Sequence, residues 1–176
     1  MLVSLWAIQN WKIIQYTECE GPLQPEVVWD SRTSSRREYN ASNLLTLSNR
    51  DIYEHGKRRA NYWLANGGLH NQGFIMKVHS CKRWIDGFRI KNKGVGSDSN
   101  WATKKFGVSS SQNADGPWTA LVAAELEEPE DQKEAELHSF LFDEAKEIQF
   151  LKFDVISYWG DAGAGLQYFS PTLAEG

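Results

Sequence analysis

The stretch 149-QFLKFDVIS-157 alternates apolar and polar residues. In an extended chain, Leu151, Phe153 and Val155 point to one side, and Lys152 and Asp154 point to the other. This period of two is typical of a strand with one face in the core and one face in water. The stretch therefore predicts a strand of an antiparallel sheet.

The same alternation recurs along most of the chain. It predicts further strands at residues 27–29, 74–79, 84–92, 104–110, 118–125 and 138–142. Turn-forming residues separate these segments, as in 113-NADGP-117 and in the glycine-rich segment 160–165. Residues 1–16 fit either an edge strand or a short helix. The sequence predicts one all-β domain of antiparallel strands, a β-sandwich at residues 27–176, preceded by an N-terminal extension at residues 1–26.

Composition narrows the functional classes. The chain has 176 residues, 41% of them hydrophobic and 24% charged, which fits one globular domain. The formal net charge of -4 has the wrong sign for a protein held by nucleic-acid phosphates, so no nucleic-acid partner is expected. No apolar run reaches the ~18 to 20 residues of a membrane span, so no transmembrane protein is expected. Cys19 and Cys81 allow one disulfide bond or none.

Enzyme motifs are missing from the sequence. It contains no GxSxG, HExxH, P-loop or Rossmann glycine pattern. The acidic run 125–136 indicates a solvated connection between strands rather than a pair of catalytic carboxylates. The sequence therefore predicts a protein that is not an enzyme, with no catalytic residues and no cofactor.

Three turn-rich segments carry the candidate binding residues, because loop side chains vary while the sheets hold them in place. The segments are 63–72, 92–101 and 158–165, and each combines an aromatic ring with amide, imidazole or carboxylate groups. Rings stack on the C–H face of a sugar, and the polar groups satisfy its hydroxyls. Trp63 and Trp118 are expected in the core. The predicted ligand contacts are His70, Asn71, Arg89, Asn92, Trp101, Trp159 and Asp161.

From residue 27 onward, the order of motifs resembles the coagulation factor 5/8 type C domain, also called the discoidin domain. The segment 40-NASNLL-45 follows a serine-rich loop, Tyr62-Trp63 comes next, and 85-IDGFRI-90 forms a glycine-hydrophobic-arginine strand. Pro117-Trp118 with Leu121 follows, and then an aromatic and aliphatic penultimate strand at 148–155. The resemblance covers about residues 27–170. It implies a jelly roll of the galactose-binding-like superfamily.

The resemblance also implies a function and a place of action. Members of this family are recognition modules, which implies a lectin-like or cell-adhesion role for a non-catalytic module that binds a glycan or glycoprotein through loops at one end. A single site of this kind is weak, so oligomerisation or neighbouring domains are expected to add avidity. The common context of the family implies an extracellular location. The lack of a basic region before the apolar residues 1–8 instead favours a cytoplasmic protein-interaction module that uses the same loops or a sheet face.

Two departures from the family bear on ligands. The residues 45-LTLSN-49 stand where the family often has an Asp-Gly-Asn calcium corner, which argues against a structural calcium ion. Leu64 stands where sugar-binding members often have a histidine after the tryptophan. The identity of the ligand is therefore left open by the sequence.

Overall fold

A computed structural model describes residues 21–31, 39–45, 52–54, 57–59, 62–68, 71–93, 101–130 and 135–174. Strands dominate this part of the chain, as the alternating sequence predicts. In chain order the elements are β1 (Glu26–Asp30), the 3-10 helix η2 (Ala41–Leu45), β2 (Ile52–Glu54), β3 (Lys57–Arg59), β4 (Trp63–Asn66), β5 (Gly73–Lys77), β6 (Arg83–Asn92), β7 (Thr103–Ser111), β8 (Thr119–Glu125), β9 (Leu137–Ile148), β10 (Phe150–Tyr158) and β11 (Gly163–Leu173).

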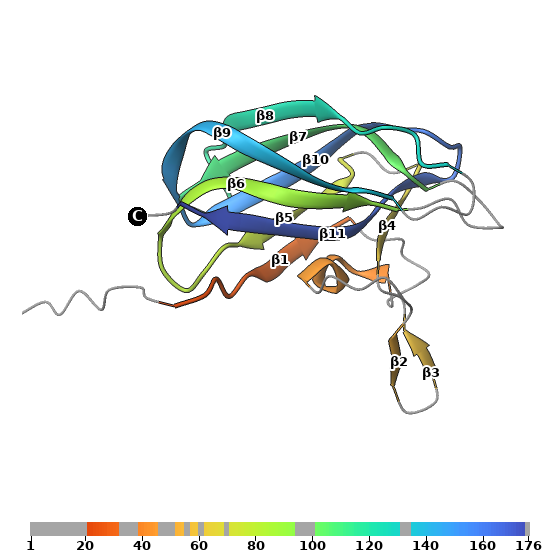
Figure 1. Ribbon diagram of the computed structural model, residues 1–176, viewed down its shortest axis with the longest axis horizontal. Helices are drawn as coiled ribbons and strands as arrows, with labels where there is room; N and C mark the ends of the chain where they lie inside the picture. The colour runs from red at the N-terminus through yellow and green to blue at the C-terminus, as the bar shows by residue number, and fades with distance from the viewer. Residues whose placement is uncertain are drawn as a thin grey trace, which may run out of the picture.

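Two antiparallel sheets form the body of the molecule (Figure 1). One sheet has the order β1-β5-β10-β7-β8 and the other has the order β4-β11-β6-β9. The strands β2 and β3 pair with each other as a separate hairpin. This arrangement confirms the predicted all-β, jelly-roll β-sandwich.

The core lies between the two sheets and consists largely of phenylalanine rings. Phe74 of β5 stacks on Phe153 of β10 at 5.1 Å between ring centroids, and it meets Phe169 of β11 edge-on at 5.3 Å across the sheets. Trp63 is fully buried beside Phe74, as predicted. Burying one such side chain stabilises a fold by roughly 1.5–3 kcal/mol, so this cluster holds the sheets together.

The predicted alternation of apolar and polar side chains in residues 149–157 is confirmed in β10. Leu151 and Phe153 are buried, whereas Lys152 and Asp154 lie on the outer face and form an ion pair at 2.9 Å. Phe153 pairs with Phe74 on one side and with Val108 of β7 on the other. The period of two therefore sets the register of the five-stranded sheet.

Some predicted boundaries were wrong. Residues 63–66 form β4 rather than a loop, and the glycine-rich segment begins the long strand β11. An added Cβ at Gly163 would lie 2.1 Å from the Ala65 carbonyl oxygen, so these glycines permit close packing of strands rather than a flexible loop. Trp118, predicted in the core, is only half-buried because it stands in the connection before β8.

The predicted N-terminal extension lies mostly outside the described residues, since residues 1–20 are not described. From Gly21 onward the chain contacts the sandwich: the Gly21 carbonyl accepts a hydrogen bond from Arg83, and the Gln24 N–H donates one to His79 Nδ1. Cys81 is disulfide-bonded, and Cys19 lies outside the described residues. No helix in the described part of the chain is long and apolar enough to cross a membrane.

Candidate functional site

Four connections meet at one end of the sandwich, at the right of Figure 1, and we call this end the loop pole. They are the β4–β5 connection (67–72), the β6–β7 connection (93–102), the β8–β9 connection (126–136) and the β10–β11 connection (159–162). Antiparallel pairing places them together, since Gly163 pairs with Asn66 and Tyr158 pairs with Thr103. The three predicted binding segments therefore share one end of the fold.

Hydrogen bonds join these connections to one another. The Tyr158 hydroxyl donates to the Gly67 carbonyl at 3.2 Å, and the Gly67 N–H donates to the Ala162 carbonyl at 2.9 Å. The Trp159 N–H donates to the Ala102 carbonyl at 2.9 Å. These bonds fix Gly67, Ala102 and Ala162, which are described residues of the three connections, relative to one another before any ligand binds.

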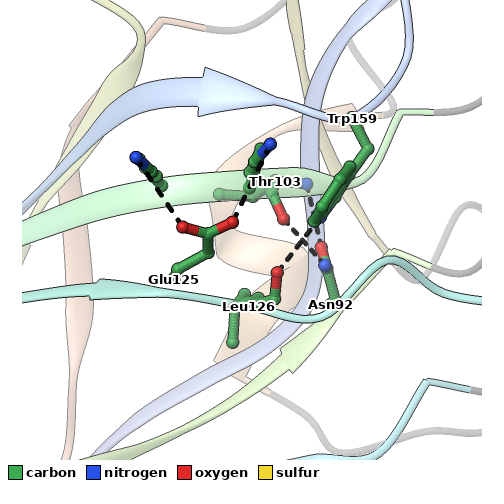
Figure 2. A network of polar contacts seen from close by, with 7 residues as sticks. Asn92, Thr103, Glu125, Leu126 and Trp159 are labelled. Carbon is green, nitrogen blue, oxygen red and sulfur yellow. Dashed lines mark hydrogen bonds and ion pairs between the residues drawn. The ribbon is translucent and has the colours of Figure 1, made fainter.

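Asn92, a predicted ligand contact, ties β6 to β7 (Figure 2). It is 3% exposed, its Nδ2 donates to the Thr103 carbonyl at 2.8 Å, and its Oδ1 accepts from the Thr103 and Lys93 N–H groups. The Thr103 hydroxyl donates in turn to the Gly165 carbonyl. Both polar groups of the Asn92 amide are already bonded to the backbone, so the role that this geometry assigns to Asn92 is structural.

Trp159 and Leu126 are bonded to each other in Figure 2. The Trp159 ring N–H donates to the Leu126 carbonyl at 3.1 Å, and the Lys104 ammonium lies 4.0 Å from the Trp159 ring centroid. Glu125 forms ion pairs with Lys104 at 3.8 Å and with Lys105 at 3.7 Å. One face of this half-buried indole is therefore covered by a cation, which attracts the electron-rich ring.

Trp101 packs on the first residues of β11. A Cβ added at Gly163 would lie 2.9 Å from the Trp101 ring, so the ring rests against a position where only glycine leaves room. Trp101 remains half-exposed. Of the two predicted loop tryptophans, Trp101 is thus held by packing and Trp159 by a hydrogen bond and a cation.

The other predicted contacts are divided between two regions. Asn71 and Asp161 are exposed at the loop pole, and Asn71 has a positive φ of 59°, a conformation that asparagine tolerates. Arg89 lies on the outer face of the four-stranded sheet, where its guanidinium stands 5.9 Å from the Tyr168 ring centroid. It does not join the loop residues. His70 lies outside the described residues.

Sequence reasoning did not single out Thr103, Lys104 or Glu125. Their contacts depend on the pairing of β7 with β8, which sets Lys105 opposite Glu125. The one available signal was the lysine pair at 104–105, which begins three residues after Trp101. Among the described residues, no three His, Cys, Asp or Glu side chains gather as a group able to hold a metal ion.

Comparison with solved structures identifies the fold. A family 32 carbohydrate-binding module from Streptococcus pneumoniae EndoD superposes with a TM-score of 0.57 at 12% identity, over 85% of this chain and 96% of that chain. The protein CpGH89CBM32-5 from Clostridium perfringens, in complex with GalNAc-β-1,3-galactose, superposes with a TM-score of 0.59 at 9% identity, over 85% and 94%. This is the discoidin, or galactose-binding-like, fold.

The galactose-binding-like fold also occurs outside sugar-binding modules. Allantoicase superposes with a TM-score of 0.59 at 11% identity, over 86% of this chain and 41% of that chain. No protein-family model and no curated protein sequence matches the chain. At such low identities the likeness concerns the fold, and the function has to be argued from the residues of the loop pole.

Proposed function

We propose that this chain is a non-catalytic module that binds a carbohydrate or glycoconjugate at the loop pole. The observation that supports the proposal is the set of hydrogen bonds among the β4–β5, β6–β7 and β10–β11 connections, which fixes Ala102 and Ala162, the chain neighbours of Trp101 and Asp161. An aromatic ring and an exposed carboxylate are together the combination that recognises a sugar, through C–H stacking and hydroxyl bonding. The sugar-bound C. perfringens module supports this proposal by its fold.

The residues of the loop pole have different roles in the proposed binding of a sugar. Trp101 offers the stacking ring, because the residue is half-exposed and packs on Gly163. Asp161 and Asn71 offer exposed hydrogen-bonding groups, and His70 is proposed with them from the sequence alone. Trp159 contributes at the margin, since its ring N–H is bonded and Lys104 covers one face. Arg89 would reach only a ligand that extends onto the sheet.

A glycan array probed with the whole chain at high concentration tests the proposal, followed by calorimetry with the best glycan. We expect Trp101→Ala to lower affinity by roughly 5-fold, since one aromatic stacking contact contributes about 1 kcal/mol. Asp161→Ala is expected to lower affinity by roughly 5-fold, because it removes one hydrogen-bonding group.

Two residues at the opposite end serve as matched controls. Trp118 is also half-buried and Asp115 is also exposed, and both lie in the β7–β8 connection (112–118). Trp118→Ala and Asp115→Ala should leave glycan affinity unchanged. A flat array, or equal losses of affinity in the loop-pole and control variants, would refute carbohydrate binding at the loop pole.

A second candidate function is that of a protein-interaction module, and exposed apolar side chains on the sandwich favour it. Trp84 of β6 is 59% exposed and Ile156 of β10 is 63% exposed, although each lies on a sheet. Scattered apolar residues are common on protein surfaces, so this observation is weaker than the bonded loops. If no glycan on the array binds, the protein-interaction function is favoured.

A further inference from the structure

β9 is an edge strand of the four-stranded sheet, and its two halves differ in how the free edge is protected. Within the described residues, β9 pairs only with β6. In its second half the Glu147 carbonyl accepts a hydrogen bond from the Gln112 side chain, and Lys146 forms an ion pair with Glu144 at 2.8 Å. Charges and capped carbonyls of this kind are how natural proteins prevent unwanted strand pairing at an edge.

Among the described residues, nothing protects the first half of β9 in this way. The segment 137-LHSFLF-142 carries no Asp, Glu, Lys, Arg or Pro. In the part of the chain that the structure describes, no side-chain hydrogen bond or ion pair involves these six residues. An uncharged strand edge with free backbone groups is a template for pairing with another strand. The difference between the halves marks this segment as a place where a strand docks.

The side chains of this segment form a nearly symmetrical pattern about Ser139. Leu137, Ser139 and Leu141 lie on the outer face, opposite Lys91, Arg89 and Gly87 of β6. Leu137 is 40% exposed and Leu141 is 73% exposed. The intervening Phe140 turns inward, where its ring stacks on Phe88 at 5.2 Å. The outer face thus presents one exposed leucine on each side of a serine, at equal spacing.

We propose that two copies of this chain pair through residues 137–142 of β9, antiparallel, about a two-fold axis that passes through Ser139. In this register Leu137 of each copy lies beside Leu141 of the other, so each of the four exposed leucines packs against a leucine of the other copy. Self-complementary contacts of this kind are what a two-fold interface requires. The four-stranded sheets of the two copies then form one continuous sheet.

The charges next to the segment agree with this register. Glu136 would face Phe142 of the other copy, and Asp143 would face Ala135, so no like charges meet directly across the pair. A second copy fits better than an unrelated strand, because the pattern about Ser139 matches itself. The interface is small and at the low end of specific contacts, which predicts a weak, concentration-dependent dimer.

The dimer has a consequence that depends on the proposed function. Because β9 begins at the loop pole and the two copies of β9 run antiparallel, the two loop poles point in opposite directions. Two glycan sites arranged in this way would cross-link separate ligands rather than bind together to one surface. The dimer itself does not depend on glycan binding.

Sedimentation velocity of the whole chain, from about 1 µM to about 1 mM, tests the pairing. We expect the mass to rise from 20.1 kDa toward twice that value with concentration. Leu141→Lys should weaken the dimer at least ~10-fold, because it places a charge on the paired face. Ile156→Lys is the matched control: Ile156 is 63% exposed on an inner strand of the other sheet, and its variant should dimerise like the natural chain.

A cross-linking experiment tests the position of the axis. Residues directly opposite in an antiparallel pair have Cα atoms about 4.5–5.5 Å apart, within the range that a disulfide bond spans. Ser139→Cys should therefore form a covalent dimer under mild oxidation. Ser170→Cys lies in the same row of the sheet, two strands from the edge, and should not. A natural chain that is monomeric at about 1 mM, a dimer unaffected by Leu141→Lys, or equal cross-linking of both cysteine variants would overturn the proposal.

Discussion

The loop pole and the β7–β8 connection at the opposite end are ordered in different ways. At the loop pole, Tyr158 bonds to Gly67, which is 91 residues away, and Trp159 bonds to Leu126, which is 33 residues away. In the β7–β8 connection, the Asn113 N–H donates to Ser111, two residues away. The loop pole is held by contacts between distant segments. The β7–β8 connection is held by bonds within its own turn, apart from the Gln112 side chain, which bonds to the Glu147 carbonyl 35 residues away.

This difference explains where a binding surface can form. A turn that closes on itself keeps its shape with little help from the rest of the fold. Connections that are bonded to one another keep their shape only when the whole sandwich is assembled, and they bring side chains from several strands to one surface. We therefore expect substitutions at the loop pole to cost more stability than equivalent substitutions in the β7–β8 connection.

The largest difference is expected between two glycines with positive φ. At Gly163, an added Cβ would collide with backbone atoms of Ala65 and Gly67, which cannot move without separating β4 from β11. At Gly116, the nearest atoms belong to the Trp118 side chain, which is half-exposed and can rotate. In urea denaturation, Gly163→Ala should lower the free energy of unfolding by about 3 kcal/mol or more, and Gly116→Ala by about 1 kcal/mol. Equal losses would remove the distinction between the two regions.

A smaller difference is expected between two asparagines. Asn92→Ala leaves the buried Thr103 N–H and carbonyl without their partners, which should cost about 2–3 kcal/mol. Asn113→Ala changes an exposed side chain in the turn and should alter the free energy of unfolding by less than about 0.5 kcal/mol. Thermal or urea denaturation measures both variants. If Asn92→Ala lowered the free energy of unfolding no more than Asn113→Ala does, the long-range bonds would contribute little to the stability of the loop pole.

The smallest effect is expected at the exposed ion pair of β9, another contact between residues two positions apart. The hydrogen bond and charge of Lys146 lower the pKa of Glu144. Because this pKa is lowered in the folded chain, the stabilising contribution of the pair is present above the ordinary glutamate pKa and is lost as the pH falls through the lowered value. An NMR titration should show the Glu144 pKa returning to its ordinary range in Lys146→Met. An unchanged pKa would show that Lys146 is not the cause.

The candidate site was predicted from the sequence only in part. The three binding segments could be recognised because their ring, glycine and amide residues interrupt regular alternation, and the structure brings these segments to one pole. The roles of individual residues within these segments could not be predicted from the sequence. Asn92 and Asp161 look alike as polar loop residues, but one is buried and fully bonded whereas the other is exposed. Burial depends on what packs above a residue, which local sequence does not specify.

The amino-acid sequence was enough to predict β1, β5 to β10 and the class of fold, because side chains alternate with a period of two wherever one face of a strand is buried. It did not predict β2, β3, β4 or β11. It did not determine that Gly163 begins a strand, that Lys104 covers Trp159, or that the first half of β9 is an unprotected edge. The tertiary structure decided these features. Each of them depends on which strand lies beside which, and that order is fixed by packing between segments far apart in the chain.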